Sequence, residues 1–411
     1  MKKIAVYLKN GIINSFVLIL NLFIRRDQSI ILIGSWMGEK FADNSRFLFQ
    51  YLHQEKQELL LKRVIWVTRN QNLKDELSEM GYEVYLCGSL KSFYWHLKSG
   101  VHILCNAIYV LQDGRFLPDI DTSLSFGAKR IQLWHGIAIK SVGAASNETI
   151  KTQISNKVSN LSWLKYFLSR GGWADYLLLS TSDKNREDMY KISRCNPDNI
   201  FISSYPRTFK CLELLPSEVA VIKKISSFTN KLIYLPTFRS SYENYQHPLT
   251  NPNVVEFIKK NNILWIEKQH SASDFSVKNF SQIENVFCLD ENFDVNVLYD
   301  YVDGVISDYS SAVFDAIYRD IPILMYVPDL EEFKQGDVGL LFDLESYCQS
   351  LIVYDLEELV EMISDVIYKR YFRDSRLSDY VKNMELFYEN RHSSYKEFWQ
   401  EITVLLGENS L

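Results

Sequence analysis

Short apolar runs alternate with helix-forming segments along this chain from about residue 28 onward, and this alternation limits the possible folds more than any other feature. Continuous apolar runs bounded by polar turns are typical of strands buried on both faces, and the helices between them supply the crossovers that parallel strands need. A first series comprises 29–35, 63–68, 82–87, 101–106, 130–135 and 174–180. A second comprises 231–237, 263–269, 285–290, 303–308 and 322–327. We therefore predict an α/β fold with two Rossmann-like domains that face each other across a cleft.

The two series of strands also set the predicted domain boundaries, and 411 residues are enough for two or three domains. Residues 28–211 form the predicted N-terminal domain and residues 231–385 the C-terminal domain. A polar, helix-prone linker spans 212–230, and residues 386–411 form a C-terminal helical tail.

The first 27 residues differ in character from the rest of the chain. They hold five Lys or Arg, at positions 2, 3, 9, 25 and 26, around an apolar run at 11–24. That run is shorter than the roughly 20 residues needed to span a bilayer, and a basic pair follows it where a signal peptide would have small residues. We predict a membrane-surface helix at the cytoplasmic face of the cell membrane, whose anionic lipids attract basic flanks. A buried N-terminal helix and a cleaved signal peptide are the alternatives.

Charge, cysteine spacing and missing motifs exclude several classes of function. The formal net charge of -6 gives no basic field for nucleic acid, and the six cysteines form no CxxC pair of a zinc or redox site. The chain has no GxGxxG, no Walker loop and no GxSxG. We predict no metal site from the histidines, whose spacing lacks ligand partners.

The residues that follow the predicted strands are unusually polar. Ligands of open α/β sheets bind beyond the carboxyl ends of strands, so these residues are candidates for a site. Those after three of the strands are His135, Gly136, Lys140, Thr237, Arg239, Lys268 and His270. Histidine can take a proton from a hydroxyl near neutral pH, and the cations, with Arg207, can offset phosphate charge. A structural histidine and solvated surface cations are the alternatives.

The segment "SDYSS" (307–311) follows a further predicted strand. Ser310 or Ser311 is placed to cap the next helix, whose free N–H groups favour an anion such as phosphate. Asp315 lies four residues beyond Ser311, on the same helix face. The alternative is an ordinary N-cap with an Asx turn.

Seven motifs occur in a fixed order: "GSWMGEKFADNSRFLFQYL", "QLWHGIAIKSVG", "YPRT", "YLPTFR", "EKQH", "SDYSSAVFDA" and "MYVPDLEEF" followed by "GLLFDL". In this order they resemble the CDP-glycerol glycerophosphotransferases of teichoic acid and capsule synthesis, over about residues 28–385.

The resemblance implies a GT-B fold and an enzyme of cell-wall synthesis that transfers glycerol phosphate, or a similar alditol phosphate, from a CDP-activated donor. The acceptor would be a hydroxyl on a lipid-linked glycan or polymer at the membrane, and CMP would be released. His135 and His270 carry over as the catalytic pair. The segment from Asp308 through Tyr309 and Ser310 to Ser311 would hold the donor phosphates. No cofactor is firmly predicted, and a role for Mg²⁺ is left open because phosphoryl transfer often recruits it.

Departures from the family pattern concern the walls of the site more than its ionisable groups. Ile137 and Ala138 stand where the family usually has Thr and Pro, which leaves the choice between CDP-glycerol and CDP-ribitol open. Two alternative functions are a GT-B glycosyltransferase that uses a nucleotide sugar and a non-catalytic scaffold of an envelope-polymer complex.

Overall fold

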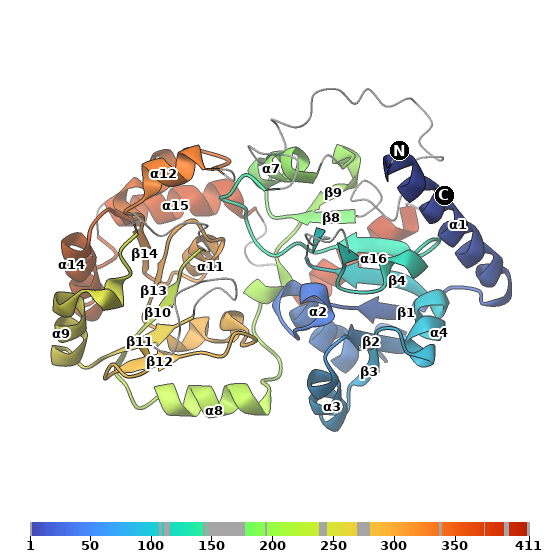
Figure 1. Cartoon of the computed structure of the whole chain (residues 1–411), viewed down its shortest axis with the longest axis horizontal. Helices are drawn as coiled ribbons and strands as arrows, with labels where there is room; N and C mark the ends of the chain where they lie inside the picture. Colours follow the sequence, from blue (N-terminus) through green and yellow to red (C-terminus); the bar gives the residue numbers. More distant parts are fainter. Residues whose placement is uncertain are drawn as a thin grey trace. The chain divides into compact units, whose positions relative to one another are not determined.

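The computed structural model describes residues 2–106, 109–110, 116–142, 145, 177–193, 195–237, 245–268, 280–336, 339–373, 375–389 and 394–408. The chain forms two compact units, coloured along the sequence in Figure 1. Unit 1 comprises Met1–His135, Ser155–Glu213 and His392–Leu411, and unit 2 comprises Gly136–Ile154 and Leu214–Arg391.

Unit 1 is built on a seven-stranded parallel sheet with the strand order β3-β2-β1-β4-β7-β8-β9. Its strands are β1 (Asp27–Ile33), β2 (Arg63–Thr68), β3 (Glu83–Leu86), β4 (Ser99–Leu104), β7 (Lys129–Gln132), β8 (Leu177–Ser180) and β9 (Ile200–Ile202). A separate antiparallel pair joins β5 (Tyr109–Val110) to β6 (Phe116–Leu117). The described helices of unit 1 are α1 (Lys2–Phe23), α2 (Asp43–Gln54), α3 (Gln71–Glu79), α4 (Leu90–Lys98), α7 (Asp183–Ser193) and α16 (Tyr395–Glu408).

Unit 2 repeats this plan with six parallel strands in the order β12-β11-β10-β13-β14-β15. The strands are β10 (Asn230–Leu235), β11 (Ile263–Glu267), β12 (Val286–Cys288), β13 (Gly304–Ser307), β14 (Ile323–Tyr326) and β15 (Ile352–Val353). The helices are α8 (Pro216–Ile225), α9 (Pro252–Lys260), α11 (Ala312–Tyr318), α12 (Leu330–Gln335), α13 (Leu344–Cys348), α14 (Leu356–Ile367) and α15 (Ser375–Phe387).

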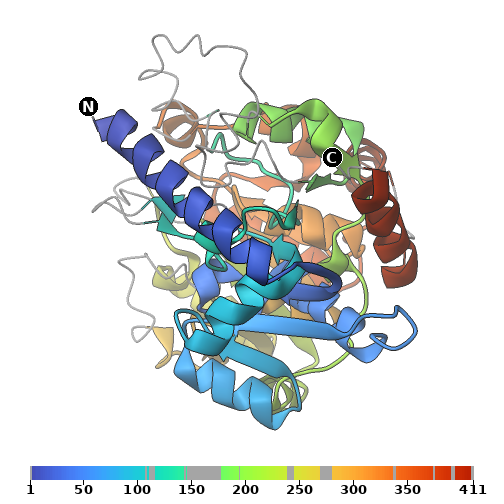
Figure 2. The same cartoon turned by 90° about the vertical axis from the view of Figure 1, so that its right-hand side faces the viewer.

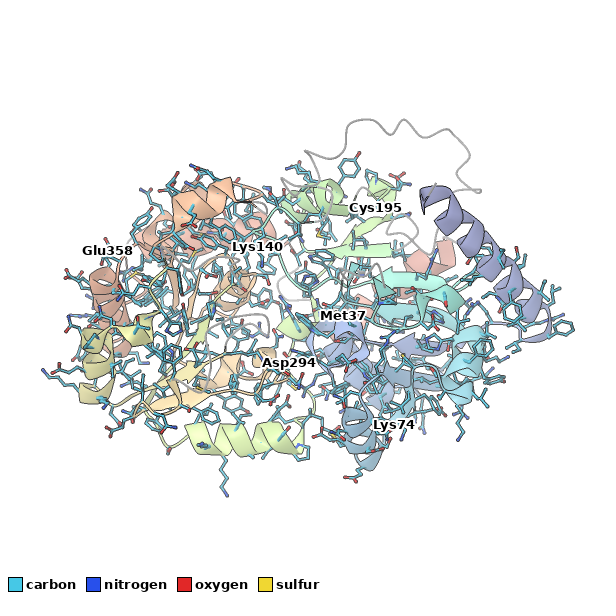
Figure 3. All side chains as sticks on the ribbon, viewed as in Figure 1. Met37, Lys74, Lys140, Cys195, Asp294 and Glu358 are labelled. Carbon is cyan, nitrogen blue, oxygen red and sulfur yellow. The ribbon has the colours of Figure 1, made fainter. Side chains whose placement is uncertain are left out.

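The central strands are buried on both faces, as their continuous apolar runs predict. Ile31, Leu32 and Ile33 of β1 are 0% exposed, and Trp66 of β2 and Trp265 of β11 are among the largest fully buried side chains. Side chains drawn as sticks show this filling of both interiors (Figure 3). The prediction of an α/β fold with two parallel sheets is confirmed.

Strand order reverses at one place in each sheet, between β1 and β4 in unit 1 and between β10 and β13 in unit 2. Connections leave the sheet in opposite directions at such a point, so a crevice opens beyond the carboxyl ends of the two strands. Each unit therefore has one preferred place for a ligand, and the predicted site residues can be compared with it.

The two units depart from contiguous domains at two segments. Residues from Gly136 belong to unit 2, where Ser141 N donates to Gly339 O at 3.1 Å and Leu341 N to Ile139 O at 2.9 Å. Helix α16 belongs to unit 1, where Phe398 and Ile402 are 0% exposed. Long-range pairing and burial, which apolar runs do not reveal, determine both exchanges.

Helix α1 packs on the outside of unit 1 against α4 and the 3-10 turn η2 (Thr122–Leu124), and Figure 2 shows it along that surface. Val17 lies in a buried cluster with Leu97 and Leu124. Just beyond the helix, Arg26 donates to the carbonyls of His96 at 2.9 Å, Ser99 at 2.7 Å, Leu124 at 2.7 Å and Phe126 at 2.6 Å. One partly buried guanidinium thus anchors the end of α1 to two loops of unit 1.

Candidate functional site

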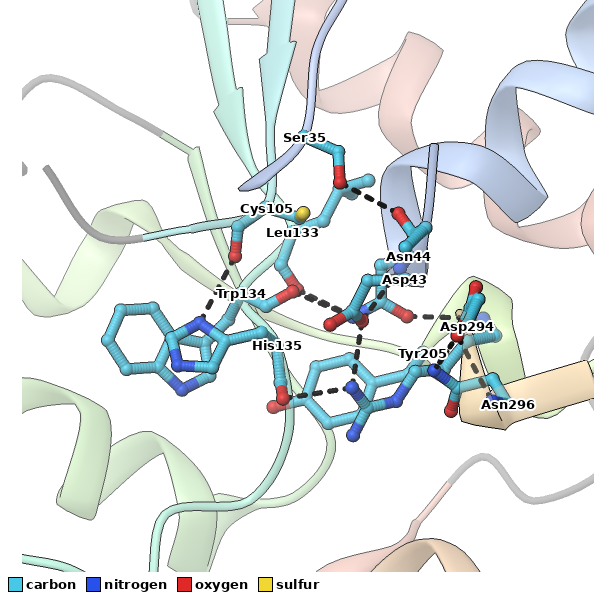
Figure 4. A network of polar contacts seen from close by, with 12 residues as sticks. Ser35, Asp43, Asn44, Cys105, Leu133, Trp134, His135, Tyr205, Asp294 and Asn296 are labelled. Carbon is cyan, nitrogen blue, oxygen red and sulfur yellow. Dashed lines mark hydrogen bonds and ion pairs between the residues drawn. The ribbon is translucent and has the colours of Figure 1, made fainter. Parts of the chain in front are cut away.

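His135 lies in unit 1, in the turn that follows β7, beside the ends of β1 and β4. Its Nδ1 lies 3.3 Å from the carbonyl oxygen of Cys105, the residue after β4 (Figure 4). A carbonyl can only accept, so Nδ1 carries the proton at this contact, and the lone pair of the ring in its neutral form is then on Nε2. This tautomer presents Nε2 as the basic atom.

Two indole rings flank the imidazole of His135. The ring of Trp134 is tilted against it with centroids 4.4 Å apart, and the ring of Trp36, from the turn after β1, lies at 6.2 Å. The imidazole is half-buried, Trp134 is buried and Trp36 is partly exposed. The ring of His135 is therefore surrounded largely by apolar side chains. Apolar surroundings of this kind strengthen electrostatic interactions of the imidazole with any charged group that comes near it.

The backbone around this histidine is unusually strained. Four residues of this region other than glycine have left-handed φ angles: Trp36 at 44°, Met37 at 59°, Asp43 at 64° and Trp134 at 56°. Gly136 follows with φ 126°, a value that suits glycine alone. Conformations of this kind cost about 1–3 kcal/mol each and gather at functional sites, where the surrounding structure enforces them.

A buried polar network enforces this turn (Figure 4). Arg207, from the 3-10 turn η6 (Pro206–Thr208), donates from Nη1 to Asp43 Oδ1 at 2.7 Å and to the His135 carbonyl at 2.9 Å. Asn44 Nδ2 donates to the Trp134 carbonyl at 2.8 Å, while its Oδ1 accepts from the Arg207 amide at 3.1 Å. The network holds the peptide groups on both sides of Trp134 and His135.

Arg207 was expected to offset phosphate charge, and its side chain is only 3% exposed beside the carboxylate of Asp43. The structure therefore gives Arg207 a role in supporting the histidine turn. Its contact with a donor phosphate stays a prediction.

Gly136 and Lys140 lie just beyond this turn, on the first segment of unit 2. Lys140 forms an isolated antiparallel bridge with Leu340, and the adjoining hydrogen bonds fix the segment against 339–341. The boundary between the two units along the sequence thus falls between His135 and Gly136.

In unit 2, Thr237 and the segment from Asp308 to Ser311 lie at the reversal between β10 and β13. Asp308, which follows β13, accepts from the amide of Thr237, which follows β10, at 2.9 Å to Oδ1 and 3.1 Å to Oδ2. Tyr309 is 0% exposed, donates its hydroxyl to Asp329 at 2.9 Å and stacks on Phe333 with centroids 3.8 Å apart. Asp308 and Tyr309 are therefore buried at this reversal, where their hydrogen bonds fix the backbone.

The two serines of the same segment differ in their local bonds. Ser310 Oγ accepts from the amide of Ala312 at 3.3 Å, whereas Ser311 makes no side-chain cap bond to the described residues. Both serines are partly exposed residues, and Asp315, on the first turn of α11, is buried. Ser311 thus occupies the N-cap position, while the side-chain bond to the first amide of α11 comes from Ser310, one residue earlier.

Lys268 extends from the end of β11 and is held by its own unit. Its ammonium donates to the carbonyls of Asp290 at 3.1 Å, Glu291 at 3.0 Å and Phe293 at 2.7 Å. An ammonium has three donors, and three carbonyls take them here. The predicted contact of Lys268 with phosphate stays untested, and the structure adds a role in fixing the loop after β12.

His270 and Arg239 lie outside the described residues, so their predicted roles stay predictions. Among the residues that the structure does describe, no group of three or more His, Cys, Asp or Glu side chains is arranged to hold a metal ion. Burial raises the pKa of the Cys105 thiol well above its usual range, which keeps this neighbour of His135 neutral.

Sequence reasoning missed three supports of the histidine turn: Asp43, Asn44 and Cys105. The first two stand within the quoted motif "GSWMGEKFADNSRFLFQYL", so their place in an ordered set was a signal that could have been used. Cys105 contributes through its carbonyl, and side-chain chemistry gives no sign of that.

Comparison with known proteins identifies the same class as the motifs. Residues 16–396 match a protein family described as CDP-glycerol:poly(glycerophosphate) glycerophosphotransferase. A teichoic acid poly(glycerol phosphate) polymerase of Bacillus spizizenii is 23% identical over 388 residues, which cover 92% of each chain. A teichoic acid glycerol-phosphate primase of Bacillus subtilis strain 168 is 26% identical over 280 residues, 65% of this chain and 68% of the relative.

Among solved structures, the wall teichoic acid polymerase TagF has a similar fold. One of its structures superposes with a TM-score of 0.67 at 15% identity and covers 99% of this chain and 98% of that chain. At this identity the likeness concerns the fold alone. The resemblance seen in the seven motifs is confirmed by the family match.

Proposed function

The chain belongs to the CDP-glycerol:poly(glycerophosphate) glycerophosphotransferase family, and on that premise we propose that it transfers glycerol phosphate from CDP-glycerol to a hydroxyl of a membrane-linked teichoic acid or capsule acceptor, releasing CMP. The observation that carries the proposal is the tethered imidazole of His135. Its Nδ1 faces the Cys105 carbonyl at 3.3 Å, which directs the basic Nε2 to the opposite side of the ring.

In the proposed reaction the acceptor oxygen attacks the phosphorus that bears the glycerol. His135 Nε2 takes the hydroxyl proton as the new P–O bond forms, and the bond to the bridging oxygen breaks so that CMP leaves. A base of this kind contributes about 10²–10⁴-fold. Positioning and charge stabilisation supply most of the remaining rate, as in other phosphoryl transfers.

The donor phosphates are proposed to bind at the β10–β13 reversal of unit 2. Asp308 fixes the backbone there by its bonds to Thr237, and the hydroxyls of the partly exposed Ser310 and Ser311 are proposed to donate to phosphate oxygens. His270, Arg239 and Lys268 are proposed to offset charge on the leaving group. The GT-B arrangement implied by the family belongs to the same proposal, as does use of CDP-ribitol by a chain with altered loop walls at Ile137 and Ala138.

We further propose that helix α1 binds the surface of an anionic membrane at the cytoplasmic face. Ile12, Phe16, Ile19 and Phe23 are 70%, 54%, 53% and 82% exposed, and their spacing puts them on one face of the helix. Arg25 is exposed at the end of this stripe, where it suits a phospholipid headgroup. Within the described residues, no helix combines the length and apolarity that crossing a bilayer requires.

The transfer is tested by CMP release from purified protein given CDP-glycerol or CDP-ribitol, with membrane extract as acceptor. We expect release that depends on acceptor and falls by at least about 10²-fold in His135→Ala. His53→Ala is the matched control, because His53 is a half-buried histidine of the same unit on α2. Acceptor-dependent release that is unchanged in His135→Ala would contradict the assigned base.

The two alternative functions give different outcomes in the same assay. A glycosyltransferase would release a nucleoside diphosphate from a nucleotide sugar and leave both CDP-alditols intact. A scaffold would turn over none of these donors, and its His135→Ala variant would keep full function in cells.

Membrane binding is tested with vesicles that contain phosphatidylglycerol. Replacing Phe16 and Phe23 by Ser removes two exposed rings, each of which contributes about 1.5–3 kcal/mol when buried, so we expect at least about 10-fold weaker binding. Leu60→Ser is the control, since Leu60 is 84% exposed away from the stripe. Equal binding by the three proteins would rule out the stripe as the membrane contact.

A further inference from the structure

Asp119 is a buried carboxylate that the proposed chemistry does not use. It is 0% exposed and follows the short strand β6 in unit 1. Its Oδ2 accepts from the amides of Cys105 at 2.9 Å and Asn106 at 2.8 Å. Its Oδ1 accepts from the amide of Met37 at 2.8 Å and from Asn106 Nδ2 at 3.3 Å. Four N–H groups from two other loops therefore converge on one side chain.

The two loops that Asp119 joins are those after β1 and β4, which flank the strand reversal of unit 1. Met37 is labelled in Figure 3 within the first of them. The backbone of Asp119 also comes close to β1, since a Cβ added at Gly34 would lie 2.5 Å from its carbonyl oxygen. Burial raises the pKa of the Asp119 carboxyl, and the hydrogen bonds from Asn106, Met37 and Cys105 act in the opposite direction.

Two routes of hydrogen bonds lead from Asp119 to the histidine turn. In the first, the Cys105 amide donates a hydrogen bond to Asp119, and the Cys105 carbonyl accepts one from Nδ1 of His135. In the second, the Asn106 carbonyl accepts from Gln132 Nε2 at 2.9 Å, and Gln132 Oε1 accepts from the Trp134 amide at 3.0 Å. The ring and the backbone of the turn thus share one support.

We propose that Asp119 is a positioning residue for the transfer reaction: by fixing the Cys105–Asn106 peptide groups, it holds His135 in the Nδ1–H tautomer with Nε2 toward the substrate. This inference rests on the proposed function only in its kinetic part. In serine proteases a carboxylate performs this orienting task by direct contact with the histidine, and here a peptide carbonyl stands between them.

Asparagine at position 119 has the same shape as aspartate, but an NH₂ donor replaces one of the two acceptor oxygens. Its NH₂ group would face either the two amides now bound to Oδ2 or the two donors now bound to Oδ1. A donor pressed against donors leaves buried N–H groups without acceptors, so the 105–106 loop would shift. The Cys105 carbonyl would then move relative to His135.

The test is ¹⁵N NMR of histidine-labelled intact protein, beside steady-state kinetics of CMP release. The chain has seven histidines, and the His135 signals are assigned by their loss in His135→Gln. We expect Nδ1–H in the unaltered protein and a mixture with Nε2–H in Asp119→Asn. We expect kcat to fall on the order of 100-fold with KM for CDP-glycerol little changed, since misplacement of a reacting group has this effect.

Asp121→Asn is the matched control, because Asp121 is a nearby acid that accepts from the Ser123 amide through one oxygen, which asparagine retains. It should alter neither the tautomer nor kcat. If Asp119→Asn is too unstable to purify, Asp119→Ser removes the carboxylate without placing an NH₂ group against the amides, and the same readouts apply.

An unchanged Nδ1–H tautomer in the folded Asp119 variant would overturn the positioning role. Absence of CMP release from the unaltered protein, with the tautomer shift still seen, would instead overturn the proposed function and leave the positioning of His135 intact.

Discussion

Arg207 and Asp43 form a buried ion pair, with 2.7 Å between Nη1 and Oδ1, across 164 residues of sequence. The same Nη1 donates to the carbonyl of His135, so the pair also fixes the backbone of the candidate base. Asp43 is in the left-handed region at φ 64°, which an ordinary helix start would not adopt. The ion pair thus compensates local strain at the start of α2.

Arg207→Ala leaves the Asp43 carboxylate buried without its partner, a change that costs about 3–5 kcal/mol of folding free energy. We expect a lower urea midpoint for unit 1 and a loss of CMP release. Arg207→Lys should recover part of the stability and little activity, because an ammonium cannot copy the planar guanidinium. A midpoint within error of the unaltered protein would contradict a structural role for the pair.

Arg26→Gln should release helix α1 from unit 1, because the guanidinium makes four bonds to carbonyls at 2.6–2.9 Å. We expect about 2–4 kcal/mol lower stability of this contact and faster proteolysis near residues 24–27. Arg25→Gln is the control, since Arg25 is exposed. Equal digestion rates for the two variants would show that Arg26 does not anchor the helix.

His96 and His102 predict a loss of stability in acid. Burial lowers the pKa of both imidazoles from 6.5, and Arg26 and Arg130 add to this at His102, while Asp121 opposes it at His96. The unfolded chain then binds more protons below about pH 6.5, so the free energy of unfolding falls as pH falls, by up to about 1.4 kcal/mol per pH unit for each group.

Urea midpoints measured from about pH 8 down to about pH 5 check this expectation. The contribution of His96 and His102 should leave the urea midpoint constant above about pH 6.5 and lower it as the pH falls below that value. His102→Gln should make the decline shallower. The same slope in both proteins would assign the acid sensitivity to other residues.

Lys268→Met separates two roles for that ammonium. If the three carbonyls of 290–293 are its main partners, the variant loses stability, by about 1.5–3 kcal/mol, and KM for CDP-glycerol changes little. Thermal unfolding and donor titrations measure both quantities. A large rise in KM at unchanged stability would instead restore the phosphate contact predicted from the motif "EKQH".

The parallel sheets were predictable because most of their strands lie in apolar runs separated by helices. Strands β9 and β15, of three and two residues, were not predicted, whereas β12, also of three residues, lies within the predicted strand 285–290. The predicted tail 386–411 contains α16, whose apolar face is covered by unit 1, and only the tertiary structure shows which surface a helix covers.

The positions of the candidate side chains at strand ends were predictable, while their roles stay predictions; the peptide groups around them were not predictable. His135, Asp308 and Ser310 follow strands and carry recognisable chemistry. The supports at Cys105 and Asn106 act through N–H and C=O, which every residue has, so no residue type marks them. Asp119 accepts from these groups and stands in a stretch with no motif.

The membership of α16 in unit 1 has a consequence for synthesis on the ribosome. Tyr395 donates its hydroxyl to the Lys210 carbonyl at 3.0 Å and stacks on Tyr51 with ring centroids 5.1 Å apart. Residues of unit 1 that are synthesised early therefore have partners that are synthesised near the end. Domains commonly fold in the order of translation. Here the strands and helices of unit 2 leave the ribosome before α16 does, so a nascent chain exposes the apolar surface that α16 later covers while unit 2 is being made.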